Sequence, residues 1–371
     1  MKITTNPLPK RTSLAVDVAI CLRERIHRGD WARYLPGEMS LARELQVGRN
    51  TVRAALVILE KEGLIHTVMG RKRELIGQVK RVEASLKKVA VILMPAPWHT
   101  LAPSTLLWMD ALRSRLNGAG WQLNMLVDTT AFRRSPTPAL ESLVMRYPLA
   151  VWILFRSTAA MQRWFERRRV NTVVAGSCHA GIKLPQVDTD FRATSRHAAA
   201  RLVGLGHRQI AILAPEISFA GDDECLTGFR EGAGQAALRV HRCNDTKASV
   251  IKALRVILTD PMCPSALFAF QADHAATALT YFSQKGVSIP SQISLISRDH
   301  EPFLTHLVPE PARYERKPEA FAKKLAQIVM ALGDGVPPKK PHQLLMPTFM
   351  RGETLGRPPV PRKNRQLIAI A

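Results

Sequence analysis

The sequence predicts a small α+β helix-turn-helix domain followed by a larger α/β domain that has two lobes, each a parallel sheet flanked by helices. Two short amphipathic helical patterns meet near Val47 and Gly48, and a pattern of two short strands follows them. Beyond residue 88, apolar strands alternate with amphipathic helices through two successive rounds. The chain has 371 residues, which exceeds one ordinary domain and leaves room for both parts.

The first domain carries three helical patterns in a row. Residues 15–26 place their apolar side chains on one stripe, with Ser13 as the expected N-cap and Gly29 as the expected stop. Residues 40–47 form a second short stripe, and residues 48–65 (GRNTVRAALVILEKEGLI) form a third. The inward face of the third helix comprises Val52, Ala55, Leu56 and Leu59. We therefore expect the third helix to pack against the rest of its domain through this apolar face.

The first half of the third helix is basic and polar. It places Arg49 and Arg53 one turn apart around Asn50 and Thr51, a surface that fits a phosphate or a base edge. A charged first turn is only a solvated face in most helices, so the interpretation depends on context. Residues 64–76 supply that context, because they predict a β-hairpin with a basic tip. The hairpin is expected to turn at Met69 and Gly70. The basic residues at or beside this tip are Arg71, Lys72 and Arg73.

Three helices and a basic hairpin resemble the winged helix of the GntR family of bacterial transcription regulators. Residues 35–65, LPGEMSLARELQVGRNTVRAALVILEKEGLI, follow the family pattern almost throughout. The resemblance implies that Arg49, Thr51 and Arg53 lie in the recognition helix, which enters the major groove of operator DNA. It also implies that Gly70, Arg71 and Arg73 belong to the wing. The chain departs from the family pattern at Met39, Gly48, Lys72 and Arg73, so an operator sequence cannot be transferred from relatives.

The second domain is predicted from a regular alternation of strands and helices. The expected strands of the first round are residues 87–95, 121–127, 149–155 and 171–176, with helices at 105–120, 138–147 and 159–168 between them. The second round has strands at residues 208–215, 265–270 and 293–297, a further strand near Arg239, and helices at 224–238, 248–260 and 273–286. Two parallel sheets in succession imply two lobes with a cleft between them.

Ordered landmarks in this domain resemble the effector domain of the LacI/GalR regulators, which has the fold of periplasmic sugar-binding proteins. They are VDTDF (187–191), LGHRQIAIL (205–213), TGFREG (227–232), ALFAFQADHAATAL (266–279) and QISLISRDH (292–300). The resemblance implies a two-lobed, periplasmic-binding-protein-like fold from residue 87 to residue 355. It also implies a small-molecule effector, a sugar or a sugar-like compound, bound between the two lobes of each chain. The resemblance further implies a homodimer.

The effector site that the resemblance implies is only partly intact. Asp190 and Asp299 match the cleft-facing aspartates of the family and could accept hydrogen bonds from sugar hydroxyls, or could instead serve in caps or ion pairs. Cys225 stands where the family has an arginine that clamps ligand, and Ala272 replaces an asparagine and leaves Asp273 beside it. These replacements leave open a second interpretation, in which the cleft is empty and the domain only dimerises.

The loop after the first strand of the α/β domain adds two candidate effector residues. Trp98 and His99 follow the carboxyl end of that strand, where ligands bind in folds of this class. Trp98 could stack on a sugar ring, or it could be a loop aromatic that packs on the lobe.

Composition agrees with a polyanionic partner. The formal net charge is +23, which favours nucleic acid through counterion release, and the excess extends beyond the first domain. The five cysteines show no C-x-x-C spacing, so neither a disulfide framework nor a zinc ribbon is indicated. The N-terminus lacks a signal-peptide core and no apolar run is long enough to span a membrane. We expect a cytoplasmic, nucleoid-associated protein with no membrane contact.

Enzyme interpretations fail on local context. Gly204, Gly206, Gly228, Gly232 and Gly234 close or interrupt helices instead of following a strand, so no dinucleotide loop is predicted. HEPFLTH at residues 300–306 lacks the zinc-protease spacing, and Pro302 would break the helix that it needs. Cys178 and His179 are adjacent on an extended chain and point to opposite sides. We expect no catalytic residues, no metal and no cofactor.

The sequence thus predicts four segments and one function. Residues 1–76 are the winged helix, residues 77–88 a linker, residues 89–355 the effector-binding and dimerisation domain, and residues 356–371 a basic, Pro-rich tail. The predicted function is transcription regulation, with repression as the arrangement more common among relatives. A regulator with a degenerate cleft, or a sugar-binding protein without a specific operator, are the alternatives. The sequence names neither the effector nor the regulated genes.

Overall fold

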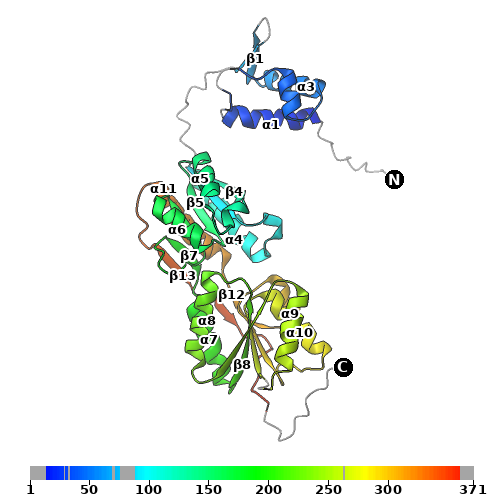
Figure 1. Ribbon diagram of the computed structural model, residues 1–371, viewed down its shortest axis with the longest axis vertical. Helices are drawn as coiled ribbons and strands as arrows, with labels where there is room; N and C mark the ends of the chain where they lie inside the picture. Colours follow the sequence, from blue (N-terminus) through cyan, green and yellow to red (C-terminus); the bar gives the residue numbers. More distant parts are fainter. Residues whose placement is uncertain are drawn as a thin grey trace, which may run out of the picture. The chain divides into compact units, whose positions relative to one another are not determined.

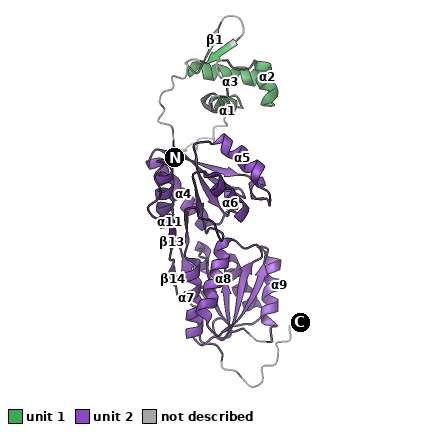
Figure 2. Ribbon diagram, turned by 60° about the vertical axis from the view of Figure 1, so that its left-hand side comes forward, with its two compact units in different colours: residues 1–86 green, residues 87–371 purple. Residues whose placement is uncertain are grey.

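The computed structural model describes residues 14–28, 30–31, 34–68, 72–75, 88–261 and 264–359. The chain divides into two compact units, residues 1–86 and residues 87–371 (Figure 2). Several predicted features lie outside the described residues. They are Ser13, Gly29, the wing residues Gly70 and Arg71, the linker except for Lys88, and the tail beyond residue 359.

The described part of the first unit consists of three helices and two paired strands (Figure 1). These elements are α1 (Leu14–Arg28), α2 (Glu38–Glu44), α3 (Arg49–Lys61), β1 (Ile65–Val68) and β2 (Lys72–Leu75). The strands pair antiparallel, with Ile65 opposite Leu75. Leu22, Leu41 and Leu56 are at most 1% exposed and join the three helices in one core. The predicted winged helix is confirmed, and a φ of +70° at Gly63 lets the chain turn from α3 into β1.

The second unit begins with a lobe, here called lobe 1, built on a six-stranded sheet of order β13-β7-β6-β5-β3-β4. Its strands are β3 (Lys88–Met94), β4 (Trp121–Val127), β5 (Val151–Phe155), β6 (Thr172–Ala175), β7 (Gln186–Thr189) and β13 (His342–Leu345). Alternate residues of β3 point to opposite faces. Ala90 and Ile92 pack with α4 (Pro103–Gly118) and α11 (Pro318–Gly333), whereas Val91 and Leu93 pack with α5 (Thr137–Arg146) and α6 (Ala159–Arg168).

The other lobe, lobe 2, has a six-stranded sheet of order β14-β12-β11-β10-β8-β9. Its strands are β8 (Gln209–Pro215), β9 (Ala237–Cys243), β10 (Ala266–Ala269), β11 (Ser294–Ser297), β12 (Ala312–Glu315) and β14 (Thr348–Met350). Its helices are α7 (Phe191–Gly204), α8 (Ala220–Ala233), α9 (Lys247–Leu258) and α10 (Ala272–Gln284). Helices α7 and α8 cover one face of the sheet, and α9 and α10 cover the other. The predicted pair of parallel sheets is confirmed, with β14 as an antiparallel edge strand.

The chain passes between the two lobes at three places in residues 88–359. It leaves lobe 1 between β7 and α7, returns between β12 and α11, and leaves again between β13 and β14. The sequence analysis identified neither α11 nor the two late strands. These returning segments make the two lobes one unit (Figure 1).

Helices α7 and α8 lie so close together that two positions of α8 have no room for a side chain. A Cβ added at Gly228 would lie 2.0 Å from the carbonyl oxygen of Arg192, and one added at Gly232 would lie 2.2 Å from that of Arg196. Only glycine therefore fits at these two positions of α8. The predicted helix of residues 224–238 is wrong at both ends, because α8 begins at Ala220 and ends at Ala233, where Gly234 has a φ of +56°.

Candidate nucleic-acid interface and ligand cleft

Helix α3 separates into a buried face and a basic face. Val52, Ala55, Leu56 and Leu59 are at most 1% exposed and fix the helix on its domain. On the other side, the side chains of Arg49 and Arg53 are 56% and 51% exposed. Asn50 is also exposed and Thr51 is half-buried. The N-cap residue Gly48 offers no side-chain hydrogen bond, so the first-turn N–H groups of α3 have no side-chain acceptor at the N-cap.

The carboxylate of Glu38, in the first turn of α2, gathers three arginines. Its oxygens accept from Arg49 Nε at 3.0 Å, from Arg53 Nη2 at 3.0 Å and from Arg73 Nη2 at 2.8 Å. Hydrogen bonds from Arg53, Arg73 and Arg49 outweigh burial and lower the pKa of Glu38 to about 2. One ionised carboxylate thus holds guanidinium groups from α3 and from the wing strand β2 in one place.

This arrangement leaves positive charge and hydrogen-bond donors beside Glu38, a chemistry suited to an anion. Three guanidinium groups share one carboxylate, so they keep net positive charge and unused N–H donors that a phosphate or a guanine edge can accept. Sequence analysis predicted Arg49, Arg53 and Arg73 for this surface but missed Glu38. The available signal was an acidic residue of the family pattern in a segment otherwise rich in arginine, and its role depends on tertiary contacts that no local pattern contains.

A hydrogen-bonded contact joins the two lobes of the second unit. Ser104, in the first turn of α4, donates from its backbone N to Glu301 Oε2 at 3.1 Å, and its hydroxyl donates to the same carboxylate. Glu301 follows β11 of lobe 2 and is 8% exposed. A carboxylate at a helix N-terminus is favoured by the free N–H groups and by the helix dipole. Glu301 therefore ties lobe 2 to lobe 1.

A buried arginine lies at the carboxyl end of β11. Arg298 is 8% exposed, and its Nη1 donates to Asp222 Oδ1 at 2.6 Å. Its Nη2 lies 3.2 Å from Asp299 Oδ2, and the rings of Phe191 and Phe270 each lie 4.6 Å from its guanidinium carbon. Burial opposes the charge, but the neighbouring carboxylates raise the pKa of Arg298 well above its usual value. The sequence analysis did not single out Arg298.

Two of the predicted effector residues meet at Arg298. Asp299 also accepts from Arg316 Nη2 at 3.2 Å. Burial raises the pKa of Asp299, but the charges of Arg298 and Arg316 outweigh it and lower the pKa. Cys225 is fully buried, its Sγ lies 2.8 Å from Ser195 Oγ, and burial raises its pKa to about 12. Arg298, the residue after β11, thus brings a guanidinium group to the thiol of Cys225, the position on α8 where the family pattern has an arginine.

The other predicted effector residues occupy separate loops. Asp190 is the N-cap of α7 and accepts from the backbone N of Ala193 at 2.9 Å. Asp273 is exposed in the first turn of α10. Trp98 and His99 lie in a short 3₁₀ helix after β3, where the Trp98 side chain is 58% exposed and the two rings meet edge-on at 6.0 Å. The structure does not bring these four residues into contact with Arg298.

A further carboxyl, not predicted from the sequence, lies at the end of β7. Asp188 is 7% exposed, and its oxygens accept from Ser177 Oγ at 2.7 Å and from the backbone N of Thr189 at 2.7 Å. Burial dominates over these hydrogen bonds and raises its pKa to about 6.

The residues considered for enzyme chemistry have structural partners. Burial raises the pKa of Cys178 to about 12, and its thiol donates to the Leu184 carbonyl at 3.4 Å. His300 Nδ1 accepts from Arg313 Nε at 3.0 Å. Within the described ranges no three His, Cys, Asp or Glu side chains are grouped to hold a metal ion, and no helix is long and apolar enough to cross a membrane.

Two family models match the chain. Residues 14–72 match the model described as bacterial regulatory proteins of the gntR family, and residues 199–355 match that of the periplasmic binding protein-like domain. The first match contains α1 to α3 with Glu38, Arg49 and Arg53, and ends one residue before Arg73. The second contains most of lobe 2, together with α11 and the two late strands.

Curated relatives of the chain are transcription regulators. The chain is 27% identical over 158 residues to the HTH-type transcriptional regulator AscG of Escherichia coli, which covers 40% of this chain and 47% of that protein. It is 23% identical over 290 residues to the arabinose metabolism transcriptional repressor of Geobacillus stearothermophilus, with 73% and 77% covered. The match thus spans about half the length of AscG but most of the arabinose repressor.

Solved structures share the fold of the second unit. A LacI family transcriptional regulator from Bifidobacterium animalis subsp. lactis aligns with a TM-score of 0.62 at 16% identity, over 74% of this chain and 99% of that one. The transcription regulator CcpA of Lactococcus lactis aligns with a TM-score of 0.63 at 11% identity, over 72% and 99%. At such identities the likeness shows the fold alone.

Proposed function

Because the chain joins a GntR-family DNA-binding domain to a periplasmic-binding-protein-like domain with the fold of LacI-family regulators, we propose that it is a repressor whose operator affinity is set by a small molecule. It acts as a homodimer on duplex DNA in the cytoplasm and needs no cofactor. The observation that carries this proposal is the cluster of Arg49, Arg53 and Arg73 around Glu38. The exposed guanidinium groups of Arg49 and Arg53, with the partly buried one of Arg73 behind Glu38, match the phosphates and guanine edges of a major groove.

The DNA contacts divide between the helix and the wing. Arg49, Asn50, Thr51 and Arg53 read bases or phosphates from the first turns of α3, whose buried face keeps the helix rigid. Gly70 and Arg71 belong to the wing, and Arg73 fixes the wing strand to the same surface through Glu38. A dimer presents two such surfaces to successive half-sites, so a change in their spacing weakens all contacts together.

The proposed effector is a sugar or a sugar-like compound held between the lobes. The family match of residues 199–355 and the printed name of the arabinose repressor support this class. The residues that would contact it are Trp98, His99, Asp190, Cys225, Asp273 and Asp299. Binding shifts the equilibrium between lobe arrangements only as far as the effector prefers one of them.

A second candidate function is a regulator whose cleft no longer senses. The guanidinium of Arg298 is already matched by Asp222 and Asp299, and Glu301 already joins the lobes to Ser104. These contacts supply from within the chain what an effector would otherwise supply, and the second unit would then serve dimerisation alone.

A thermal-shift screen of the full chain separates the two candidates. The panel holds monosaccharides, disaccharides, sugar acids and nucleosides, and a ligand at about a hundred times its Kd adds about 2.7 kcal/mol of stability. A sensor gives a hit that Asp190→Asn and Asp299→Asn remove, whereas Asp223→Asn, an exposed change on α8, preserves it. Absence of any hit across the panel favours the dimerisation-only regulator.

A sugar-binding protein without a specific operator remains the third alternative. It would give the same hits in the thermal-shift screen but would bind all duplexes alike. Sequence-selective DNA binding that Arg49→Ala weakens would exclude it.

A further inference from the structure

A hollow of about 470 Å³ lies on lobe 1 between the start of α5 and the outer side of α6. Four arginines line it, together with hydroxyl and aromatic side chains. The residues that matter are Arg134, Arg163, Arg167, Arg168, Thr137 and Trp164. We call this hollow the arginine basin. None of its lining residues is among the cleft residues described above, and both of its helices cover the sheet face opposite α4 and α11.

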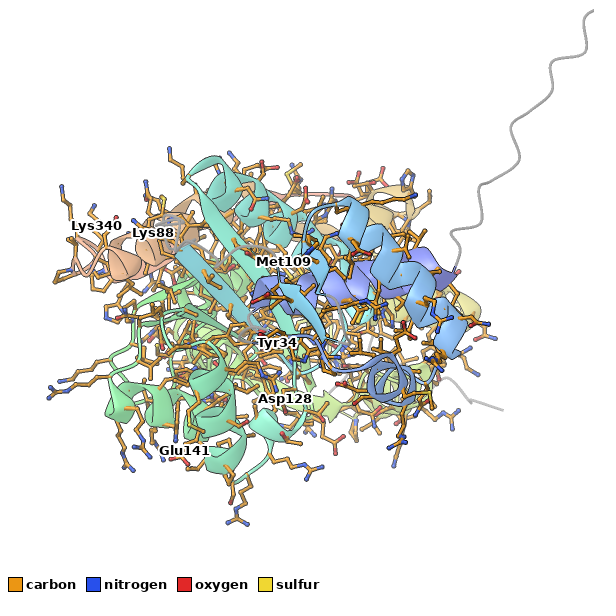
Figure 3. The ribbon with its side chains drawn as sticks, turned by 90° about the horizontal axis from the view of Figure 1, so that it is seen from above. Tyr34, Lys88, Met109, Asp128, Glu141 and Lys340 are labelled. Atoms are coloured by element: carbon orange, nitrogen blue, oxygen red, sulfur yellow. The ribbon has the colours of Figure 1, made fainter. Side chains whose placement is uncertain are left out.

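The charge of the arginine basin is not balanced by its surroundings. Residues 129–171 contain eight arginines, no lysine and only two acidic residues, Glu141 and Glu166. Glu141 pairs with Arg168, and its side chain is directed outward from α5 (Figure 3). Glu166 accepts from the backbone N of Lys183 at 2.6 Å. Across the described ranges, Arg134, Arg163 and Arg167 therefore take part in no ion pair.

The position of these charges is unfavourable without a ligand. Arg163 and Arg167 lie four residues apart on α6, where like charges repel, and Arg134 adds a third positive charge at the same hollow. A bound anion would remove this repulsion. The absence of lysine among these cations favours a phosphate ligand. The planar guanidinium group donates two parallel hydrogen bonds to a pair of phosphate oxygens, whereas the lysine ammonium acts as a point charge.

Neutral groups of the arginine basin complete a phosphate site. Thr137 and Ser135 supply hydroxyl donors, and Thr137 begins the ten-residue helix α5, whose N-cap Pro136 offers no side-chain hydrogen bond. The N–H groups of Thr137 and Ala139 in the first turn are suited to an anion, whereas Pro138 has none. Trp164 forms part of the wall, and its indole Nε1 is buried with no hydrogen-bond partner in the described part of the chain.

We infer that the arginine basin binds a small anion with two or more phosphoryl groups. A single carboxylate or one phosphoryl group occupies one or two guanidinium groups, and the basin offers three that are unpaired. The site is separate from the effector cleft and from the proposed DNA surface, so it goes beyond the proposed function and would connect the protein to a second, phosphorylated signal.

Isothermal titration of the full chain with inorganic pyrophosphate at about 150 mM chloride tests this inference. We expect saturable binding that Arg163→Gln with Arg167→Gln weakens at least tenfold. The lysine pair Arg163→Lys with Arg167→Lys keeps the charge but loses the paired donors, so it should weaken binding by an intermediate factor. The matched control is Arg115→Gln with Arg230→Gln, which removes two exposed arginines elsewhere on the unit and should leave the Kd within about twofold.

Three results would overturn the inference. One is the absence of saturable pyrophosphate binding. Another is equal weakening by the basin and control variants, which would mean that net charge alone attracts the anion. The third is a basin variant that binds pyrophosphate normally but shows a smaller salt dependence of nonspecific duplex binding, which would assign these arginines to the DNA backbone.

Discussion

Glu38 and Arg73 form an ion pair of 2.8 Å although they lie 35 residues apart in the chain. The pair joins the start of α2 to the wing strand β2, and the two side chains are 13% and 23% exposed. Because Arg49 and Arg53 of α3 share the same carboxylate, the contact sets the wing and the helix relative to each other within the first unit. Glu38 is thus a positioning residue for the proposed DNA surface.

Replacing Glu38 by glutamine should separate specificity from charge. Glu38→Gln adds one positive charge, so nonspecific DNA affinity should rise. It also releases three guanidinium groups, so the ratio of specific to nonspecific affinity should fall about tenfold or more, equivalent to about 1.4 kcal/mol. Fluorescence anisotropy on selected and shuffled duplexes measures both. Glu44→Gln, in the same helix, is the control, and an equal rise in both affinities with Glu38→Gln would refute a positioning role.

The stability of the first unit should depend on pH through Glu38. Its pKa is lowered from 4.5 to about 2, so the ionised form is favoured in the folded state. The stabilisation is complete above pH 4.5 and is lost as the pH falls toward 2. Denaturation of the first unit, followed by circular dichroism across this range, should show a decline that Glu38→Gln lacks. A parallel decline in the variant would assign the pH dependence to other carboxyls.

Asp188 should give the opposite pH dependence in the second unit. Burial raises its pKa from 3.8 to about 6, so the neutral form is favoured in the folded state. The stabilisation is present below pH 3.8 and is lost as the pH rises through 6, by about 3 kcal/mol at most. Urea unfolding monitored by tryptophan fluorescence between pH 4 and 7 should show this loss in the native chain but not in Asp188→Asn. A variant that retains the full slope would contradict the assignment.

Substitution of Gly228 should destabilise lobe 2. The new Cβ of Gly228→Ala would lie 2.0 Å from the backbone oxygen of Arg192, so α7 and α8 must move apart. Overpacking of this kind costs about 1 to 3 kcal/mol. Gly204→Ala, at the end of α7 with nothing within 4 Å of the added carbon, is the matched control and should change stability little. Equal thermal midpoints for the two variants would show that the helices can separate without cost.

Local patterns were sufficient to predict most of the architecture. The stripe of Val52, Ala55, Leu56 and Leu59 identified the buried face of α3, and the alternation of strands and helices predicted both sheets. The late elements were not predicted, because α11 looks like any amphipathic helix. The edge strands β13 and β14 are only four and three residues long, with half-exposed side chains. Their place in different lobes follows from tertiary pairing alone.

Site residues were predictable from the sequence only where they lie together on one helix or strand. Arg49, Asn50, Thr51 and Arg53 lie within five positions of α3, so the composition of one helix revealed them. Glu38 and Arg298 act through partners from other elements, and neither residue type is unusual at its own position. The same holds for the arginine basin, which becomes a site only when α6 folds against the segment before α5.

The measurement that tests the central claim most directly is the affinity of the full chain for two duplexes at about 150 mM salt. One duplex is selected by the protein from a random pool, and the other has the same bases in shuffled order. A specific regulator should bind the selected duplex about a thousandfold more tightly or better. Arg49→Ala should remove about 1 to 3 kcal/mol of that preference. Equal affinity for both duplexes, with the same salt dependence, would mean that the protein is a nonspecific polycation and would contradict the account.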